Sequence, residues 1–568
     1  MIGVAETGTV AGVADPGCDA RSSPQICRGQ RHAATAEVET RRPRRVRVDG
    51  DPTPSTPAAA TARCGICPKS LKSSNNCETL YSLKPHMKHS ILIFIAVAAL
   101  AAACPCYSQA TQEWVQTYNG TGDGLDISFS VVVDNLGNVY VAGNSPGDTS
   151  ANDITTIKYD SAGQQQWVRR YNGPGNSDDG TNGTNAIAVD DSGNVYVTGW
   201  SAGTENTDYV VIKYNSNGDE QWAQRYNGPG NDYDAPYGIA LDSSGNVYVT
   251  GTSTGDGAGF DYTTIKYAND GQQQWVKSYN GTGNGYDAAL ALAVDASGNV
   301  CVTGISTAPN GLGDCVTIKY DTDGNQQWAK TYDGAANGND YGNSVTVDTS
   351  GNVYVTGTSA GAETGQDYLT IKYDSSGQQL WASTYSSPKN NWDEGRSIGL
   401  DGSGNVYVTG VLEYSEGKAS TDDWGTIKYN SSGVEQWVRQ YNGPANIADE
   451  AWSIAVDANG SSYVVGYSHG PTSGSDLTSI KYDTDGVQQW VEAYDSPTHG
   501  TDSGFDIALD SQGNVYVTGA SGLGIAIDYV TIKYSQAGGP TPTPTPTSTP
   551  RATPAPRPRP TPHPRPTP

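Results

Sequence analysis

The sequence is poor in basic residues, and it has no long hydrophobic run. Lys and Arg number 34 against 60 Asp and Glu, and the formal net charge is −26. Contacts to phosphate groups need Lys and Arg, so this balance argues against nucleic acid as a partner. The longest apolar run covers residues 91–103 and is shorter than the ~20 residues of a membrane-spanning helix. No transmembrane segment is therefore predicted.

Methionine is also scarce and occurs only at positions 1 and 87. Met87 begins a short basic stretch that leads into the apolar run and then into the small-residue exit SQA, which ends at Ala110. These three parts are typical of a secretory signal peptide. We therefore predict a signal peptide over 87–110, cleavage after Ala110, and a protein that is secreted or held at the cell envelope or surface. Lipidation at Cys104 is the alternative.

The two ends of the chain differ from its middle. Residues 1–86 are rich in Arg and carry no pattern, so we interpret them as a mis-assigned or disordered N-terminal extension. Residues 540–568 alternate Pro with Thr and then with Arg, a composition that favours extended polyproline structure without a core. We interpret this tail as a disordered stalk or linker.

A single sequence unit recurs eight times over residues 111–539. One copy contains the phrases GNVYVTG at 245–251 and DYTTIKY at 261–267. Regular recurrence at such a period marks a solenoid, a propeller or an array. Each copy contains one tryptophan with an expected structural role: Trp114, Trp167, Trp222, Trp275, Trp328, Trp381, Trp437 and Trp490.

Each copy holds four segments rich in β-branched and aromatic residues, separated by Gly, Asn, Asp and Ser. This alternation is typical of strands and turns, and four antiparallel strands per repeat describe the blade of a β-propeller. We name the strands A to D in chain order. The mature chain begins with a lone D strand at 112–115, and the last copy stops after its C strand at 530–534. The sequence therefore predicts an all-β, eight-bladed propeller whose N-terminal strand pairs in blade 8 and closes the ring.

Loop lengths differ between the two faces of the predicted disc. The A-to-B and C-to-D turns keep one length in every copy, whereas the B-to-C connection grows from 251–261 in blade 3 to 410–423 in blade 6. The D-to-A loop is expected to vary too, being longer over 171–182 than over 226–234. Both variable connections would lie on one face. Loops on a rigid scaffold commonly carry function, so this face is the predicted recognition surface.

The phrases at 245–251 and 261–267 resemble the bacterial β-propeller repeat family of secreted and surface proteins, the SBBP repeats. The resemblance covers all eight copies, and it implies a propeller fold, an exported location and no catalytic residues. The segment DSAGQQQW at 160–167 is similar to the tryptophan-docking motif of eight-bladed quinoprotein dehydrogenases, with a shorter Asp-to-Gly spacing. It implies that the Trp rings stack between blades. The adjacent cysteines of those enzymes are absent from these repeats.

Acidic residues recur at fixed positions of the repeat. Asp and Asn bond nearby backbone N–H groups in turns, so most of them are interpreted as turn residues. One set begins strand A, and its functional alternative is a carboxylate collar at the channel mouth that holds a cation such as Ca²⁺. No other cofactor is predicted. The collar would consist of Asp126, Asp234, Asp287, Asp340, Asp393, Asp449 and Asp502, with Asn182 in blade 2.

Only two cysteines lie in the repeats, both in blade 4. Cys301 and Cys315 take the tyrosine positions of strands B and C, which Tyr248 and Tyr262 occupy one blade earlier. The two strands are antiparallel neighbours and both positions change together, so a disulfide is predicted for an exported protein. The alternatives are two buried free thiols, or Cα atoms too far apart to bridge.

Departures from the eightfold pattern gather in blades 6 and 7. Blade 6 has the longest B-to-C loop, and both blades place aromatic, cationic and acidic side chains on one rim, as in surfaces that bind sugars or peptides. The candidate ligand-binding residues are Lys389, Trp392, Glu394, Arg396, Tyr414, Glu450, Trp452 and His469.

Together these features predict a monomeric, non-enzymatic binding scaffold for an extracellular glycan, peptide or protein. The alternative is a quinoprotein-like oxidoreductase or a glycan-cleaving enzyme that uses the same face. His469 and His499 are the only histidines of the repeats and lie in different blades. No motif indicates a nucleophilic Ser or Cys, so no catalytic residue is assigned.

Overall fold

The computed structural model describes residues 110–122, 124–147, 151–203, 206–257, 259–388, 392–416, 419–471, 474–524 and 526–536. The N-terminal extension, nearly all of the predicted signal peptide, Cys104 and the Pro-rich tail lie outside these ranges. Within them every regular element is a strand. No helix that could cross a membrane is found in the described parts.

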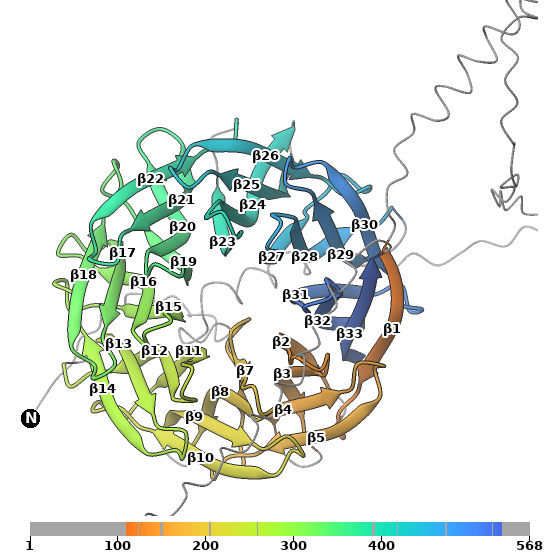
Figure 1. The fold of residues 1–568 in the computed structure, drawn as a ribbon, viewed down its shortest axis with the longest axis horizontal. Helices are drawn as coiled ribbons and strands as arrows, with labels where there is room; N and C mark the ends of the chain where they lie inside the picture. The colour runs from red at the N-terminus through yellow and green to blue at the C-terminus, as the bar shows by residue number, and fades with distance from the viewer. Residues whose placement is uncertain are drawn as a thin grey trace, which may run out of the picture. The chain divides into compact units, whose positions relative to one another are not determined.

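The strands form eight antiparallel sheets arranged in a ring, which confirms the predicted eight-bladed propeller (Figure 1). Blade 1 contains β2 (Ile127–Val133), β3 (Val139–Pro146), β4 (Asn152–Tyr159) and β5 (Gln165–Tyr171). Blade 2 contains β6 (Asp179–Gly180), β7 (Ile187–Val189), β8 (Val195–Ala202), β9 (Thr207–Tyr214) and β10 (Glu220–Tyr226). Blade 3 contains β11 (Asp234–Leu241), β12 (Val247–Thr254), β13 (Phe260–Tyr267) and β14 (Gln273–Tyr279), and blade 4 contains β15 (Asp287–Val294), β16 (Val300–Thr307), β17 (Gly313–Tyr320) and β18 (Gln326–Tyr332). Blade 5 contains β19 (Tyr341–Val347), β20 (Val353–Gly361), β21 (Gly365–Tyr373) and β22 (Gln379–Tyr385). Blade 6 contains β23 (Asp393–Leu400), β24 (Val406–Glu416), β25 (Ala419–Tyr429) and β26 (Glu435–Tyr441), and blade 7 contains β27 (Glu450–Val456), β28 (Ser462–His469), β29 (Ser475–Tyr482) and β30 (Gln488–Tyr494). Blade 8 contains β31 (Thr501–Leu509), β32 (Val515–Leu523), β33 (Ala526–Gln536) and β1 (Ala110–Tyr118).

The ring is closed by the N-terminal strand, as the sequence predicts. β1 pairs antiparallel with β33, placing Trp114 opposite Lys533 and Val115 opposite Ile532. The other blades show the same register, with Trp167 opposite Lys158 in blade 1. Blade 8 therefore has the same four strands as its neighbours, and no open strand edge is left where the ring begins and ends.

Seven of the eight blades are joined to the next by the tryptophan of the D strand, and the exception is blade 7, where Nε1 of Trp490 has no hydrogen-bond partner among the described residues. Trp167 in blade 1 donates from Nε1 to the carbonyl oxygen of Ser216 in blade 2, over 3.2 Å. Its ring lies against Gly218, where φ is +82° and an added Cβ atom would come within 2.8 Å of the ring. Only glycine tolerates both conditions. The same hydrogen bond and the same glycine contact recur at Trp114, Trp222, Trp275, Trp328, Trp381 and Trp437.

At six of the eight junctions a lysine of strand C donates to the same carbonyl oxygen as the tryptophan. Lys158 donates from Nζ to the same Ser216 carbonyl oxygen over 3.1 Å, and the Nζ atom lies 5.1 Å from the ring centroid of Tyr140 in its own blade. The cation–π geometry and the hydrogen bond together hold the lysine between blades. Two lysines differ. Lys319 donates from Nζ to the carbonyl oxygen of Gly351 over 3.4 Å and pairs with Asp295 at 2.9 Å, and Lys481 donates to Gln536 Oε1.

The expected variation of the D-to-A loop is wrong. In blade 2 the position of Asp234 is taken by Asp179, which accepts a hydrogen bond from Gly173 N–H as Asp234 does from Gly228 N–H. The collar residue of blade 2 is therefore Asp179 rather than Asn182. The extra residues of blade 2 lie inside its innermost strand, which is split into β6 and β7. The D-to-A loop keeps one length, and length variation outside blade 2's innermost strand is confined to the B-to-C connections.

The predicted disulfide is wrong as well. Cys301 and Cys315 are free, buried thiols. In the β16–β17 pair, Cys301 lies opposite Lys319, and Cys315 lies opposite Ile305. Both cysteines occupy the N-terminal part of their strand, so the antiparallel pairing separates them along the hairpin. Burial raises the pKa of each thiol to about 12.

The tryptophan–glycine contact yields a test. We expect Gly218→Ala to lower the midpoint of urea unfolding more than Gly311→Ala. Both residues have left-handed φ angles, so an added Cβ costs roughly 1–2 kcal/mol of strain at each, but Gly311 has open space around it and Gly218 faces the Trp167 ring. Tryptophan fluorescence during urea titration measures both midpoints. Equal losses would mean that the ring contact adds nothing to backbone strain.

Candidate ligand-binding site

The innermost strand of nearly every blade contains one bulged residue. In β23 the register shifts between Gly395 and Ser397, which leaves Arg396 unpaired, and the same shift isolates Trp452 in β27 and Phe505 in β31. A bulge re-aims its side chain, and these strands are the ones nearest the centre of the ring (Figure 1). The half-buried bulged residues are Phe129, Tyr237, Leu290, Asn343, Arg396, Trp452 and Phe505.

Four of these residues make a continuous arc across blades 6, 7, 8 and 1. The guanidinium carbon of Arg396 lies 4.1 Å from the ring centroid of Trp452. Trp452 meets Phe505 edge-on at 5.7 Å, and Phe505 lies 5.3 Å from Phe129. Cation–π and aromatic contacts of this kind add stability beyond simple burial. The arc is therefore a fixed aromatic surface with one guanidinium at its end.

Two carboxylates hold that guanidinium. Arg396 pairs with Glu394 Oε2 at 3.2 Å and with Glu450 Oε2 at 2.7 Å. Asn343 donates to Glu394 Oε1 over 3.1 Å. The Arg396 side chain is only 12% exposed, so the pairs are weakly screened by solvent. With two carboxylates to one guanidinium, the cluster is negative rather than positive.

A tyrosine extends this network outward. Burial, followed by the charge and the hydrogen bond of Glu450, raises the pKa of Tyr467 far above its ordinary value. The Tyr467 ring meets the His469 ring edge-on at 5.7 Å. His469 is also fixed by a contact between Nδ1 and the carbonyl oxygen of Ala448. The cluster thus runs from the bulge of β23 to the end of β28.

Asp506, next to Phe505, is buried without a countercharge among the described residues. It accepts hydrogen bonds from Val131 N–H at 2.9 Å and from Ser453 Oγ at 3.0 Å, so it ties blades 7 and 1 to blade 8. Burial raises the pKa of Asp506 to about 7. At the same repeat position blades 1 and 7 have Ser130 and Ser453, so this carboxyl group breaks the symmetry of the ring.

The structure brings together four of the eight predicted ligand-binding residues. Glu394, Arg396, Glu450 and Trp452 form the cluster, and His469 joins it through Tyr467. Trp392 lies instead at the base of the β24–β25 hairpin, where its N–H donates to Glu413 Oε2 over 3.1 Å. Lys389 and the side chain of Tyr414 lie outside the described residues.

The predicted carboxylate collar does not form as an open ring. Asp126, Asp234, Asp287, Asp340, Asp393, Asp449 and Asp502 are all 0% exposed. Each accepts a hydrogen bond from the backbone N–H six residues before it, so each carboxylate serves its own turn. Asp340 also lies with Asp314 and Asp333, and Asp502 with Asp476 and Asp495, at spacings that could hold a metal ion.

Sequence reasoning missed Phe129, Phe505 and Tyr467. Phe129 and Phe505 occupy the repeat position of Arg396 and Trp452, three residues after the aspartate that begins strand A. Comparing that one position across all copies would have found them. Tyr467 carries no such signal, because its role depends on the neighbouring Glu450.

These sheets and their closure define an eight-bladed β-propeller of four-stranded antiparallel blades. The chain carries SBBP β-propeller repeats, and that family matches residues 166–205, 221–258, 330–362 and 436–471. No curated protein matches the chain.

Several solved structures are similar in part. An ulvan lyase, a polysaccharide lyase bound to -[GlcA(1-4)Rha3S]-, has a TM-score of 0.41 and 11% identity, covering 73% of this chain and 95% of its own. The WD40 domain of SCAP from fission yeast has a TM-score of 0.41 and 10% identity, covering 74% and 97%. The calcium-binding protein regucalcin from Agrobacterium tumefaciens has a TM-score of 0.29 and 14% identity, covering 54% and 92%. At TM-scores this low the likenesses say nothing about the ligand of this chain.

The buried Asp506 predicts a pH dependence of stability. Its pKa is about 7 in the folded protein against 3.8 for an unperturbed Asp, so the folded state binds the proton more tightly than the unfolded state. The resulting stabilisation is fully present below about pH 4 and is lost as the pH rises through about 7. We expect the advantage of the wild type over Asp506→Ser in urea unfolding to shrink between pH 5 and pH 8. A constant difference over this range would contradict the prediction.

Proposed function

We propose that this protein is an exported binding scaffold without catalytic activity, and that it recognises a glycan, peptide or protein at the Arg396–Trp452 cluster. The proposal depends on one observation, the arc formed by Arg396, Trp452, Phe505 and Phe129. Large aromatic side chains and Arg supply most of the free energy in typical binding surfaces. Their faces suit the apolar side of a sugar ring or an aliphatic side chain.

The rigidity of the cluster supports binding. Each member of the arc is fixed by a bulge in a paired strand, and Arg396 is held on both sides by carboxylates. A surface that is already ordered loses little conformational entropy when a ligand arrives. Side chains placed on strands are also held more precisely than side chains on loops.

The position of the cluster fits recognition on the variable-loop face. The innermost strands begin on the side where the B-to-C connections lie, because strand A starts where strand B ends. Blade 6 adds the longest hairpin of the ring on that side, β24 with β25. A ligand at the Arg396–Trp452 cluster could also contact this hairpin.

Trp452→Ala in the full chain tests the proposal. The full chain is screened on a glycan and peptide array, and affinity for any hit is then measured by calorimetry. We expect at least a tenfold loss on Trp452→Ala, because an aromatic residue at the centre of a binding surface contributes roughly 2 kcal/mol or more. Phe260→Ala is the matched control, since Phe260 is an aromatic residue at the start of β13, on the same side but in blade 3.

Two outcomes would overturn the proposal. Unchanged binding in Trp452→Ala would remove the cluster as the recognition site. Turnover of any glycan on the panel, or redox activity after reconstitution with a quinone, would instead favour the enzyme alternative.

Export is tested separately by the N-terminus of the secreted protein. β1 begins at Ala110, so cleavage after that residue keeps the strand that closes the ring. We expect N-terminal sequencing of the exported protein to begin at Thr111. A mature N-terminus beyond Tyr118 would contradict this expectation, because the closing strand would be lost.

A further inference from the structure

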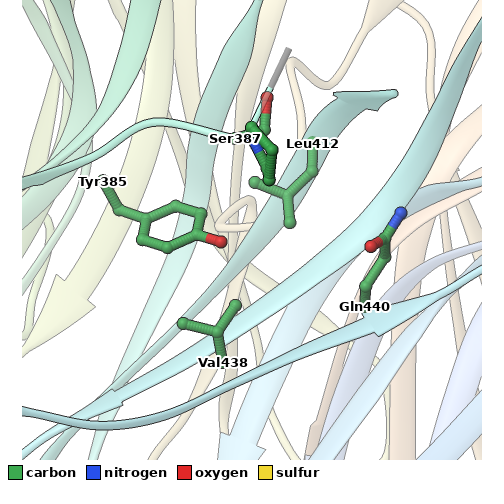
Figure 2. Close-up of a pocket in the computed structure, with 6 residues that line it drawn as sticks. Tyr385, Ser387, Leu412, Val438 and Gln440 are labelled. Atoms are coloured by element: carbon green, nitrogen blue, oxygen red, sulfur yellow. The ribbon is translucent and has the colours of Figure 1, made fainter. Parts of the chain in front are cut away.

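A cavity of about 200 Å³ lies at the junction of blades 5 and 6, lined by Tyr385, Ser387, Pro388, Leu412, Val438 and Gln440. Figure 2 shows the Tyr385 hydroxyl pointing into the space between Leu412 and Val438, with Gln440 on the far side. Pro388 and Gln440 are exposed, whereas Leu412 and Ser387 are buried. The cavity is therefore open at one end and closed by Leu412 and Ser387 at the other.

In blade 1 the corresponding space is filled by an arginine. Arg170 immediately precedes the last tyrosine of its D strand, as Gln440 does in blade 6. Its guanidinium donates to Tyr118 Oη at 3.4 Å, to Ser145 Oγ at 2.7 Å and to Asp153 Oδ2 at 3.0 Å. Tyr118, Ser145 and Asp153 are the counterparts of Tyr385, Leu412 and Asp423.

Blade 2 repeats this arrangement. Arg225 donates to the carbonyl oxygen of Ser201 at 3.0 Å and to Asp208 Oδ2 at 2.8 Å. In both blades the glycine that corresponds to Ser387 lies beside the guanidinium: a Cβ atom on Gly120 or Gly173 would come within 3.1 or 3.2 Å of it. The same wall positions therefore surround a guanidinium group in two other blades of this chain.

Blade 6 keeps the tyrosine and the aspartate of this slot, but it has Leu412 in place of the serine and Gln440 in place of the cation. Gln440 is shorter than Arg and donates from Nε2 to Asp423 Oδ2, which leaves its carbonyl oxygen as an acceptor. Asp423 is 0% exposed, and its Oδ1 atom has no hydrogen-bond partner. Burial raises the pKa of Asp423 to about 6, and the charges of Asp449 and Asp422 add to this effect.

We propose that this cavity is a guanidinium-binding site, which takes an arginine side chain presented by a basic peptide or protein. The guanidinium enters past Pro388, donates to Tyr385 Oη and Gln440 Oε1, and lies between the apolar faces of Leu412 and Val438. Arginine suits such a slot because its guanidinium is planar, permanently charged and weakly hydrated. The net charge of −26 favours the approach of a basic partner.

Binding of Nα-acetyl-arginine amide to the full chain, measured by calorimetry, tests the proposal. We expect Gln440→Arg to weaken binding at least tenfold, because its own guanidinium would fill the slot as Arg170 does. We expect Arg170→Gln to raise the stoichiometry by one site, because it opens the slot of blade 1. Unchanged affinity in a folded Gln440→Arg protein would overturn the proposal.

The probe chemistry separates charge from shape. The citrulline analogue has the same shape without the charge, and we expect it to bind at least tenfold more weakly. Equal binding of the two would overturn the guanidinium assignment. A Gly-Arg-Gly peptide should bind more tightly than free arginine, and equal affinity would overturn the peptide as the source of the group. Trp452→Ala should leave all of these values unchanged, so a failure here is distinct from a failure of the scaffold proposal.

Discussion

The contact between one tryptophan and one glycine of the next blade organises the whole molecule. At six of the eight junctions the indole N–H and the strand-C lysine converge on one carbonyl oxygen, as Trp167 and Lys158 do, and the indole ring occupies the space that a Cβ atom would need. Two donors on one acceptor leave little freedom for the angle between neighbouring blades. Repeating that angle determines how many blades complete the circle, and here the number is eight. Because Trp rings are large and rigid, each junction also buries much apolar surface at low entropic cost.

Residues that act within one repeat unit could be predicted from the sequence. The tryptophan spacing, the strand segments and the lone N-terminal strand gave the fold, the blade number and the closure. Residues whose role depends on register could not. Counting forward from Tyr171 by the spacing of the other blades makes Asp179 the residue that begins strand A of blade 2, whereas counting back from Asp190 by their spacing makes it Asn182. Only the split of this innermost strand into β6 and β7 decides between the two residues. The disulfide prediction was wrong for a similar reason. The two cysteines lie near the start of neighbouring antiparallel strands, and the starts of such strands are at opposite ends of the hairpin.

Part of the candidate site could also be predicted from the sequence. Glu394, Arg396, Glu450 and Trp452 were identified because they break an eightfold pattern. Their contacts could not be predicted from the sequence, because these depend on a bulge that places one residue of each innermost strand next to its counterpart in the following blade. Asp506 shows the same limit. It stands where blades 1, 5, 6 and 7 have serine, but its burial and its donors from two other blades are visible only in three dimensions.

The order in which the strands pair has a consequence for biogenesis. β1 is made first by the ribosome, and its partner β33 is made last. Until Tyr534 has been synthesised, seven blades can form but the first strand has no sheet to join. The circle therefore cannot close until β33 has been synthesised. A chain that begins to fold only after β33 has been made avoids this delay, because both strands are then present before either must pair.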